Sequence, residues 1–164
     1  YPLMRVKEMI ALPVRTVVHP DALLFMWTTM SAIPDALQVI DAWGFQFVTN
    51  GFTWVKTHPN SGRAVVGLGM WTRHNAEICL LAKRGRPIRQ SAAVRSLVIA
   101  PRRRHSEKPD EVRDHIVELC GDVPRLEMFA RRKTPGWDIW GNELINDVEL
   151  EPVCAKPVCM NSRT

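Results

Sequence analysis

The sequence Ala22-Leu-Leu-Phe-Met-Trp-Thr28 decides the fold class of this chain, together with the Pro34-Asp-Ala-Leu-Gln-Val-Ile-Asp-Ala-Trp-Gly44 that follows it. The first segment is a short run of large apolar residues, which predicts a buried β-strand. The second has a proline suited to the first helical turn, apolar residues at helical spacing and a closing glycine, which together predict an α-helix. A strand that leads into a helix is typical of an α/β domain.

The neighbouring segments extend this pattern. Residues 45–57 alternate apolar and polar side chains around Asn50-Gly51, which predicts either a hairpin or one long strand with a bulge at the glycine. Three more strands are expected at 77–83, 96–100 and 125–130, and a second helix from Pro109 to Gly121. The alternation predicts a mainly parallel sheet with helices on both faces and ligands at the carboxyl ends of its strands.

Length and composition favour one domain. The chain has 164 residues, of which 46% are hydrophobic, so we expect a single core over residues 1–150 and a loosely ordered tail over 151–164. Because no run approaches the roughly 20 apolar residues of a membrane span, we expect a soluble, cytoplasmic protein. Cys154 and Cys159 could form half of a metal site, but no matching pair exists elsewhere, so we predict no metal.

Basic residues are concentrated in one region. The formal net charge is +5, and between residues 83 and 108 the only acidic residue is Glu107. Such a run favours nucleic acid through attraction to phosphates, although a solvated surface loop is an equally good interpretation. The basic residues of this run are Lys83, Arg84, Arg86, Arg89, Arg95, Arg102, Arg103, Arg104 and Lys108.

Two polar segments are candidates for ligand binding. Gly67-Leu-Gly69 precedes Trp71, Arg73 and His74, which could stack on and hydrogen-bond to a base, although an ordinary glycine turn would look the same. The segment Gly141-Asn142-Glu143 follows Arg131 closely enough to place a cation, an amide and a carboxylate around one polar ligand. No phosphate-binding Walker loop and no G-x-G-x-x-G motif is present to identify a cofactor.

Taken in order, these motifs resemble the MT-A family of N6-adenine methyltransferases, and the small bacterial and phage members in particular. The resemblance runs from about Tyr1 to Glu149. The segments that carry it are Leu24-Phe-Met-Trp27, Trp43-Gly44, Phe52-Thr-Trp-Val-Lys56, Gly67-Leu-Gly-Met-Trp-Thr-Arg-His-Asn-Ala-Glu77, His105-Ser-Glu-Lys-Pro-Asp-Glu111, Glu127-Met-Phe-Ala-Arg131 and Gly136-Trp-Asp-Ile-Trp-Gly-Asn142.

The resemblance implies a circularly permuted, Rossmann-like class I fold. It also implies an enzyme that binds S-adenosylmethionine (SAM) and methylates the N6 amine of adenine in nucleic acid, and DNA fits as the substrate better than RNA. It assigns Lys108 to the carboxylate or ribose region of SAM. Phe129 and Arg131 are expected to line the cofactor pocket, and Asn142 and Glu143 to hold the ribose hydroxyls, where many members have glutamine in place of Glu143. The residues expected to bind nucleic acid are Trp71, Arg73, His74, Glu77, Arg102, Arg103 and Arg104.

One family motif is missing. The catalytic Asp-Pro-Pro-aromatic sequence, which activates the poorly nucleophilic adenine amine, does not occur in these residues, so no catalytic residue is assigned. Because the chain begins at Tyr1 and not at Met, we expect that the motif lies upstream and that the chain alone is inactive. Two alternatives stay open: a non-catalytic nucleic-acid-binding relative that supports a partner subunit, and an unrelated α/β nucleotide-binding domain. Either a methyltransferase or a non-catalytic relative of this family could form a homodimer or a heterodimer.

Overall fold

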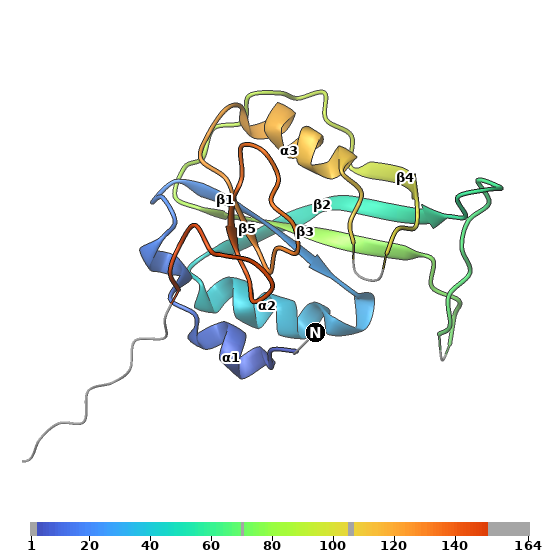
Figure 1. The fold of residues 1–164 in the computed structure, drawn as a ribbon, viewed down its shortest axis with the longest axis horizontal. Helices are drawn as coiled ribbons and strands as arrows, with labels where there is room; N and C mark the ends of the chain where they lie inside the picture. The colour runs from blue at the N-terminus through green and yellow to red at the C-terminus, as the bar shows by residue number, and fades with distance from the viewer. Residues whose placement is uncertain (1–2, 70, 105–106, 151–164) are drawn as a thin grey trace, which may run out of the picture.

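The computed structural model describes residues 3–69, 71–104 and 107–150, and Figure 1 shows their arrangement. Most of the expected elements form within a residue or two of their predicted bounds, whereas α1 and β6 had no counterpart in the sequence analysis. Two short 3-10 turns lie at Val14–Thr16 and Met30–Ala32. The helices are α1 (Val6–Ala11), α2 (Ile33–Ala42) and α3 (Glu111–Cys120), and the strands are β1 (Ala22–Thr28), β2 (Gln46–Thr57), β3 (Ala76–Arg84), β4 (Leu97–Pro101), β5 (Leu126–Met128) and β6 (Asp138–Trp140).

The main sheet has four strands in the order β1-β3-β2-β4. β3 is antiparallel to both β1 and β2, and only the β2–β4 pair is parallel. The prediction of a mainly parallel sheet is therefore wrong for these strands. The reason lies in the connection over residues 58–75, in which the described residues form no helix and the chain returns directly to the neighbouring strand, because neighbours joined without a crossover must run antiparallel. β5 and β6 form a separate parallel pair.

Residues 46–57 form one strand, not a hairpin. The pairing of β2 with β3 shifts register between Phe47 and Thr49 and again between Asn50 and Phe52. Gly51 lies in the second shift, where a Cβ atom would come within 3.2 Å of the Cys79 carbonyl oxygen and of the Leu81 Cβ. The bulge at this glycine, one of the two predicted alternatives, is confirmed.

Helices cover both faces of the sheet, as predicted. Because side chains alternate along a strand, β1 directs Leu24 and Met26 into a core under α1 and α2, and Phe25 and Trp27 into a core under α3 (Figure 1). In the first core the Trp43 indole donates a hydrogen bond to the Met9 carbonyl at 2.8 Å. In the second, the fully buried Trp54 indole donates to the Ala100 carbonyl at 2.9 Å. These bonds fix α1 on α2 and β4 on β2.

The helix α3 ends where the sequence predicts it. Gly121 has a φ of +79°, a conformation that favours glycine, and its N–H donates to the Val117 carbonyl at 2.8 Å. Among the described residues, no helix is long and apolar enough to cross a membrane. The predicted tail over 151–164, with Cys154 and Cys159, lies outside the residues that the structure describes.

Candidate functional site

Glu77 is the centre of a group of charges where β2, β3 and the segment before α3 meet. Its carboxylate accepts a hydrogen bond from Lys108 Nζ at 2.5 Å and forms a second ion pair with Lys56. The side chains of Glu77, Lys108 and Lys56 are 18%, 25% and 28% exposed. Burial would raise the pKa of Glu77, but the two lysines outweigh it and hold this pKa below its ordinary value of 4.5. The group is therefore charged at neutral pH and carries one excess positive charge.

Two tryptophan rings form the floor beneath these charges. Lys108 Nζ lies 5.5 Å from the ring centroid of Trp27, and Lys56 Nζ lies 5.2 Å from that of Trp54. The rings themselves meet edge to face with centroids 6.4 Å apart. Each ammonium group thus contacts both a carboxylate and an aromatic face, an arrangement that limits the orientations of both lysines. We name Trp27, Trp54, Lys56, Glu77 and Lys108 the Glu77 cluster.

The nearby thiol does not contribute a nucleophile. Cys79 is fully buried two residues after Glu77, and burial raises the pKa of its thiol to about 12. Burial also raises the pKa of Cys120. Because the thiolate is the reactive form, both described cysteines act as small core residues at neutral pH.

The second polar group lies where β5 and β6 end side by side. Phe129 directly follows β5 with a φ of +58°, and its ring is 44% exposed and packs edge to face on Trp140 at 5.4 Å. Arg131 Nε lies 3.3 Å from Glu143 Oε2. A Cβ atom at Gly141 would be 2.7 Å from the Ala130 carbonyl, so the two segments run close together. The predicted meeting of Arg131 with the turn that contains Glu143 is confirmed as a contact, and Asn142 lies exposed in the same turn.

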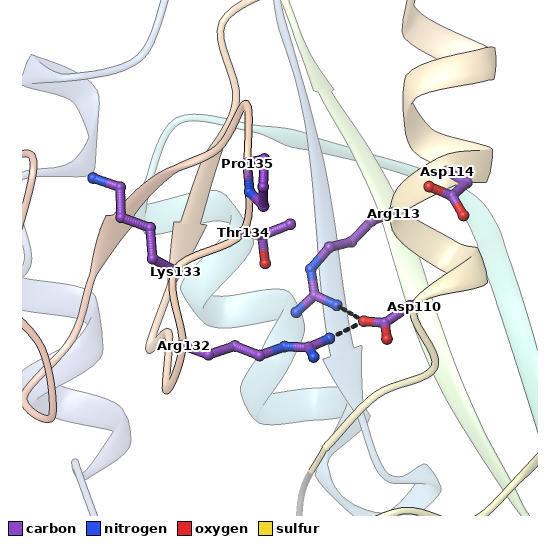
Figure 2. A pocket seen from close by; sticks show the side chains of 7 residues that line it. All are labelled: Asp110, Arg113, Asp114, Arg132, Lys133, Thr134 and Pro135. Carbon is purple, nitrogen blue, oxygen red and sulfur yellow. Dashed lines mark hydrogen bonds and ion pairs between the residues drawn. The ribbon is translucent and has the colours of Figure 1, made fainter.

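Ion pairs connect these two groups. Asp110, two residues after Lys108, pairs with Arg132, which follows Arg131 (Figure 2). The same carboxylate pairs with Arg103 and with Arg113. Three of the five residues predicted from the resemblance to bind the cofactor, Lys108, Phe129 and Arg131, therefore lie on two segments that one carboxylate joins. The fourth, Glu143, pairs with Arg131, and the fifth, Asn142, is adjacent to Glu143. We name the joined segments, 107–110 and 129–134, the cofactor segments.

Three of the seven residues predicted to bind nucleic acid, Trp71, Arg73 and His74, lie on the long β2–β3 connection, which projects from the sheet (Figure 1). Trp71 is 97% exposed, and Arg73 and His74 are also on the surface. The Gly67 N–H donates to the His74 carbonyl at 2.7 Å, and a Cβ atom on Gly67 would collide with that carbonyl. The glycines thus serve a tight turn, as in the simpler interpretation, but the half-buried tryptophan that this interpretation includes is not found, because Trp71 is almost fully exposed.

The three arginines that follow β4 do not share one environment. Arg102 lines a shallow pocket with His58 and Arg63, and its N–H donates to the Thr57 carbonyl at 2.9 Å. Arg103 instead turns toward Asp110, and Arg104 is exposed. Glu77, predicted on the nucleic-acid side, contacts Lys108, predicted on the cofactor side. The two predicted sides therefore meet at the Glu77 cluster.

The sequence does not mark Trp27, Trp54 and Lys56 as site residues, although each lies in a segment that carries the family resemblance. The available signal was a lysine at the end of an alternating apolar strand, which by itself is indistinguishable from an ordinary surface lysine. Their role depends on pairing across strands, since Trp54 in β2 lies opposite Glu77 in β3.

Several known proteins have sequences similar to that of this chain. A family described as MT-A70 matches residues 1–143. The chain is 36% identical over 153 residues to the Type II methyltransferase M.MunI of Mycoplasma sp, which covers 92% of this chain and 63% of that protein. It is 30% identical over 144 residues to the human N(6)-adenosine-methyltransferase catalytic subunit METTL3, covering 83% of this chain and 24% of that protein. A probable N(6)-adenosine-methyltransferase MT-A70-like protein of Oryza sativa subsp. japonica is 31% identical over 137 residues, covering 79% and 19%.

The chain spans less than two thirds of the length of each of these relatives. The family match nevertheless extends through the Glu77 cluster, both cofactor segments and the projecting loop. The family resemblance drawn from the separate motifs is confirmed, and this chain belongs to the MT-A70 family of SAM-dependent N6-adenine methyltransferases.

Proposed function

We propose that this chain forms the cofactor-binding and nucleic-acid-binding part of an enzyme that methylates the N6 amine of adenine in DNA. The observation that carries the proposal is the Lys108–Glu77 ion pair, which brings a residue assigned to the cofactor into contact with one assigned to the nucleic acid. A methyl transfer requires donor and acceptor at one place, because the reacting atoms must approach within about 3–3.5 Å.

The residues predicted to bind the cofactor fit SAM chemically. SAM supplies an electrophilic methyl group when bound, and it offers a carboxylate, ribose hydroxyls and an adenine ring for recognition. Lys108 provides a cation for the carboxylate, the exposed Glu143 and Asn142 accept from hydroxyls, and Phe129 offers a partly exposed ring. Phe129, Asn142 and Glu143 follow the carboxyl ends of the parallel β5–β6 pair, where ligands of α/β proteins bind.

The projecting loop and the Arg102 pocket suit a nucleic acid. Trp71 presents a free ring face of the kind that stacks on an unpaired base, a contact that contributes about 1–3 kcal/mol per base. Arg63 and Arg102 line, with His58, a pocket that no described carboxylate lines, so the charges of the two arginines are available to phosphates. Arg73, His74 and Arg104 extend this surface, whereas the charge of Arg103 is shared with Asp110.

DNA is the proposed substrate because the bacterial relative that aligns with 92% of this chain is named a Type II methyltransferase. We also propose the circularly permuted class I topology for the whole enzyme. Its cytoplasmic location and the possible dimer remain predictions. Since the 164 residues contain no Asp-Pro-Pro sequence, we expect the chain on its own to bind both ligands without transferring the methyl group.

The proposal is tested by calorimetric titration with SAM and by fluorescence anisotropy with an adenine-containing duplex and its single strands. Lys108→Gln removes one charged contact, which contributes about 1.5–3 kcal/mol, so SAM affinity is expected to fall about 10- to 100-fold. The matched control is Lys83→Gln, an exposed lysine in β3, which should bind as the wild type does. DNA binding without SAM binding would favour the alternative, a non-catalytic relative that supports a partner subunit.

A further inference from the structure

Asp110 occupies the position before α3 but does not cap the helix. An aspartate at this position normally accepts a hydrogen bond from a backbone N–H in the first turn and so stabilises the helix. Here no side-chain capping bond forms, and the residue itself has helical dihedral angles, with φ −65° and ψ −31°. The carboxylate instead contacts three guanidinium groups, one of them on Arg113 in the first turn of the helix and two on Arg103 and Arg132 outside it.

The three arginines come from three different segments. Arg103 belongs to the basic loop after β4. Arg113 belongs to the first turn of α3 and Arg132 to the chain after β5 (Figure 2). Arg113 also binds Glu127 of β5 through two hydrogen bonds of 2.6 and 3.0 Å. These ion pairs, which we name the Asp110 network, therefore join α3 to β5 and the chain that follows it, whereas neither hydrophobic core contains residues of both elements.

The network is balanced in charge, so it does not form an anion site. Its three arginines are matched by Asp110, Glu127 and Glu107, which lies 3.7 Å from Arg103. Burial raises the pKa of Asp110. The hydrogen bond from Arg103 and the charges of the surrounding arginines outweigh this effect, so the pKa lies below its ordinary value of 3.8. Asp110 is therefore ionised at neutral pH, and each of the three arginines has a carboxylate partner. The ion pairs therefore suit a structural role, in which they hold neighbouring segments of the chain together.

What the network fastens is the pair of cofactor segments. Lys108 lies two residues before Asp110, and Arg131 directly precedes Arg132. Lys108 is held on its other side by Glu77, and Arg131 on its other side by Glu143. The separation between the Lys108 ammonium and the Arg131–Glu143 pair is therefore set by contacts that pass through the carboxylate of Asp110.

We infer that Asp110 is a positioning residue, which holds Lys108 and the Arg131–Glu143 pair at the spacing needed to contact one SAM molecule. This inference rests on the proposed function, since it assumes that both segments bind the same cofactor. Asp110 itself does not touch the ligand. Its removal should therefore weaken SAM binding only as far as Lys108 takes part in that binding.

The test compares Asp110→Asn with Asp114→Asn in the 164-residue chain. Asp114 lines the same pocket on the same helix, is exposed and forms no ion pair among the described residues, which makes it a matched control (Figure 2). Hydrogen exchange without SAM should accelerate in both 107–112 and 128–134 for Asp110→Asn, and in neither for Asp114→Asn. Unchanged exchange in Asp110→Asn would overturn the fastening, whether or not SAM binds.

Calorimetry then measures the positioning. Asp110→Asn should weaken SAM about 5- to 20-fold, Asp110→Glu should restore most of the affinity, and in a Lys108→Gln background Asp110→Asn should have less than about a twofold effect. Equal effects in both backgrounds would overturn the inference, because Asp110 would then act independently of Lys108. Should Asp110→Asn fail to fold, Arg132→Gln takes its place, since it leaves the Asp110–Arg113 pair intact. Failure of the wild-type chain to bind SAM would refute the proposed function, and this inference with it.

Discussion

Replacing Glu77 with glutamine tests the Glu77 cluster most directly. The substitution keeps the volume of the side chain but removes the charge that two lysines share. All three side chains are less than a third exposed, so solvent screens them only in part. A hydrogen bond to a charged group contributes about 1.5–3 kcal/mol, and the amide retains some of each bond. We therefore expect Glu77→Gln to lower the free energy of unfolding by about 2–3 kcal/mol, and the Tm by about 6–9 °C for a chain of this size.

The pH dependence sharpens this prediction. Because the pKa of Glu77 is lowered in the folded protein, its stabilising contribution is fully present above the unfolded value of 4.5 and is lost as the pH falls through the lower folded value. The Tm difference between wild type and Glu77→Gln should therefore be constant from pH 7 down to about pH 5, and then narrow.

Thermal unfolding followed by circular dichroism measures the difference. Glu149→Gln is the control, because Glu149 is exposed and has no ion pair among the described residues, so its substitution should change stability by less than about 0.5 kcal/mol. A Glu77→Gln protein whose Tm lies within about 1 °C of the wild type at pH 7 would refute the reasoning. A difference that persists undiminished at pH 3 would refute the assignment of that difference to the carboxylate charge.

Three further predictions concern the core and the projecting loop. Trp54→Phe should cost about 2–3 kcal/mol in urea unfolding, since it leaves a cavity and removes the donor to the Ala100 carbonyl; a cost under about 0.5 kcal/mol would contradict this. Cys79, with its thiol pKa raised to about 12, should escape iodoacetamide at pH 8 until the protein is unfolded, as peptide mass mapping would show, and rapid labelling of the native chain would disprove its burial. Trp71→Ala should leave the Tm within about 2 °C but weaken single-stranded DNA binding about 5- to 100-fold in anisotropy, whereas unchanged affinity would exclude stacking by this ring.

The sequence by itself determined the local structure of most elements. The apolar run of 22–28, the helical spacing of 34–43 and the stop at Gly121 each depend on neighbours along the chain, and each forms where the pattern indicates. The order of the motifs also identified the family, because that information is linear. The Asn50-Gly51 pattern left two possibilities open, since a turn and a bulge require the same glycine. Only the partner strand could distinguish them.

The tertiary structure decided the features that depend on which segments meet. The antiparallel direction of β3 followed from the connection over 58–75, whose described residues form no helix, and local propensity does not predict which strands become neighbours. Arg102, Arg103 and Arg104 are equivalent in sequence, but only Arg103 lies within reach of Asp110, so its charge is shared and that of Arg102 faces an open pocket. Lys56 and Lys108 converge on Glu77 from segments about 50 residues apart, because charges interact through space and the fold alone sets their separation.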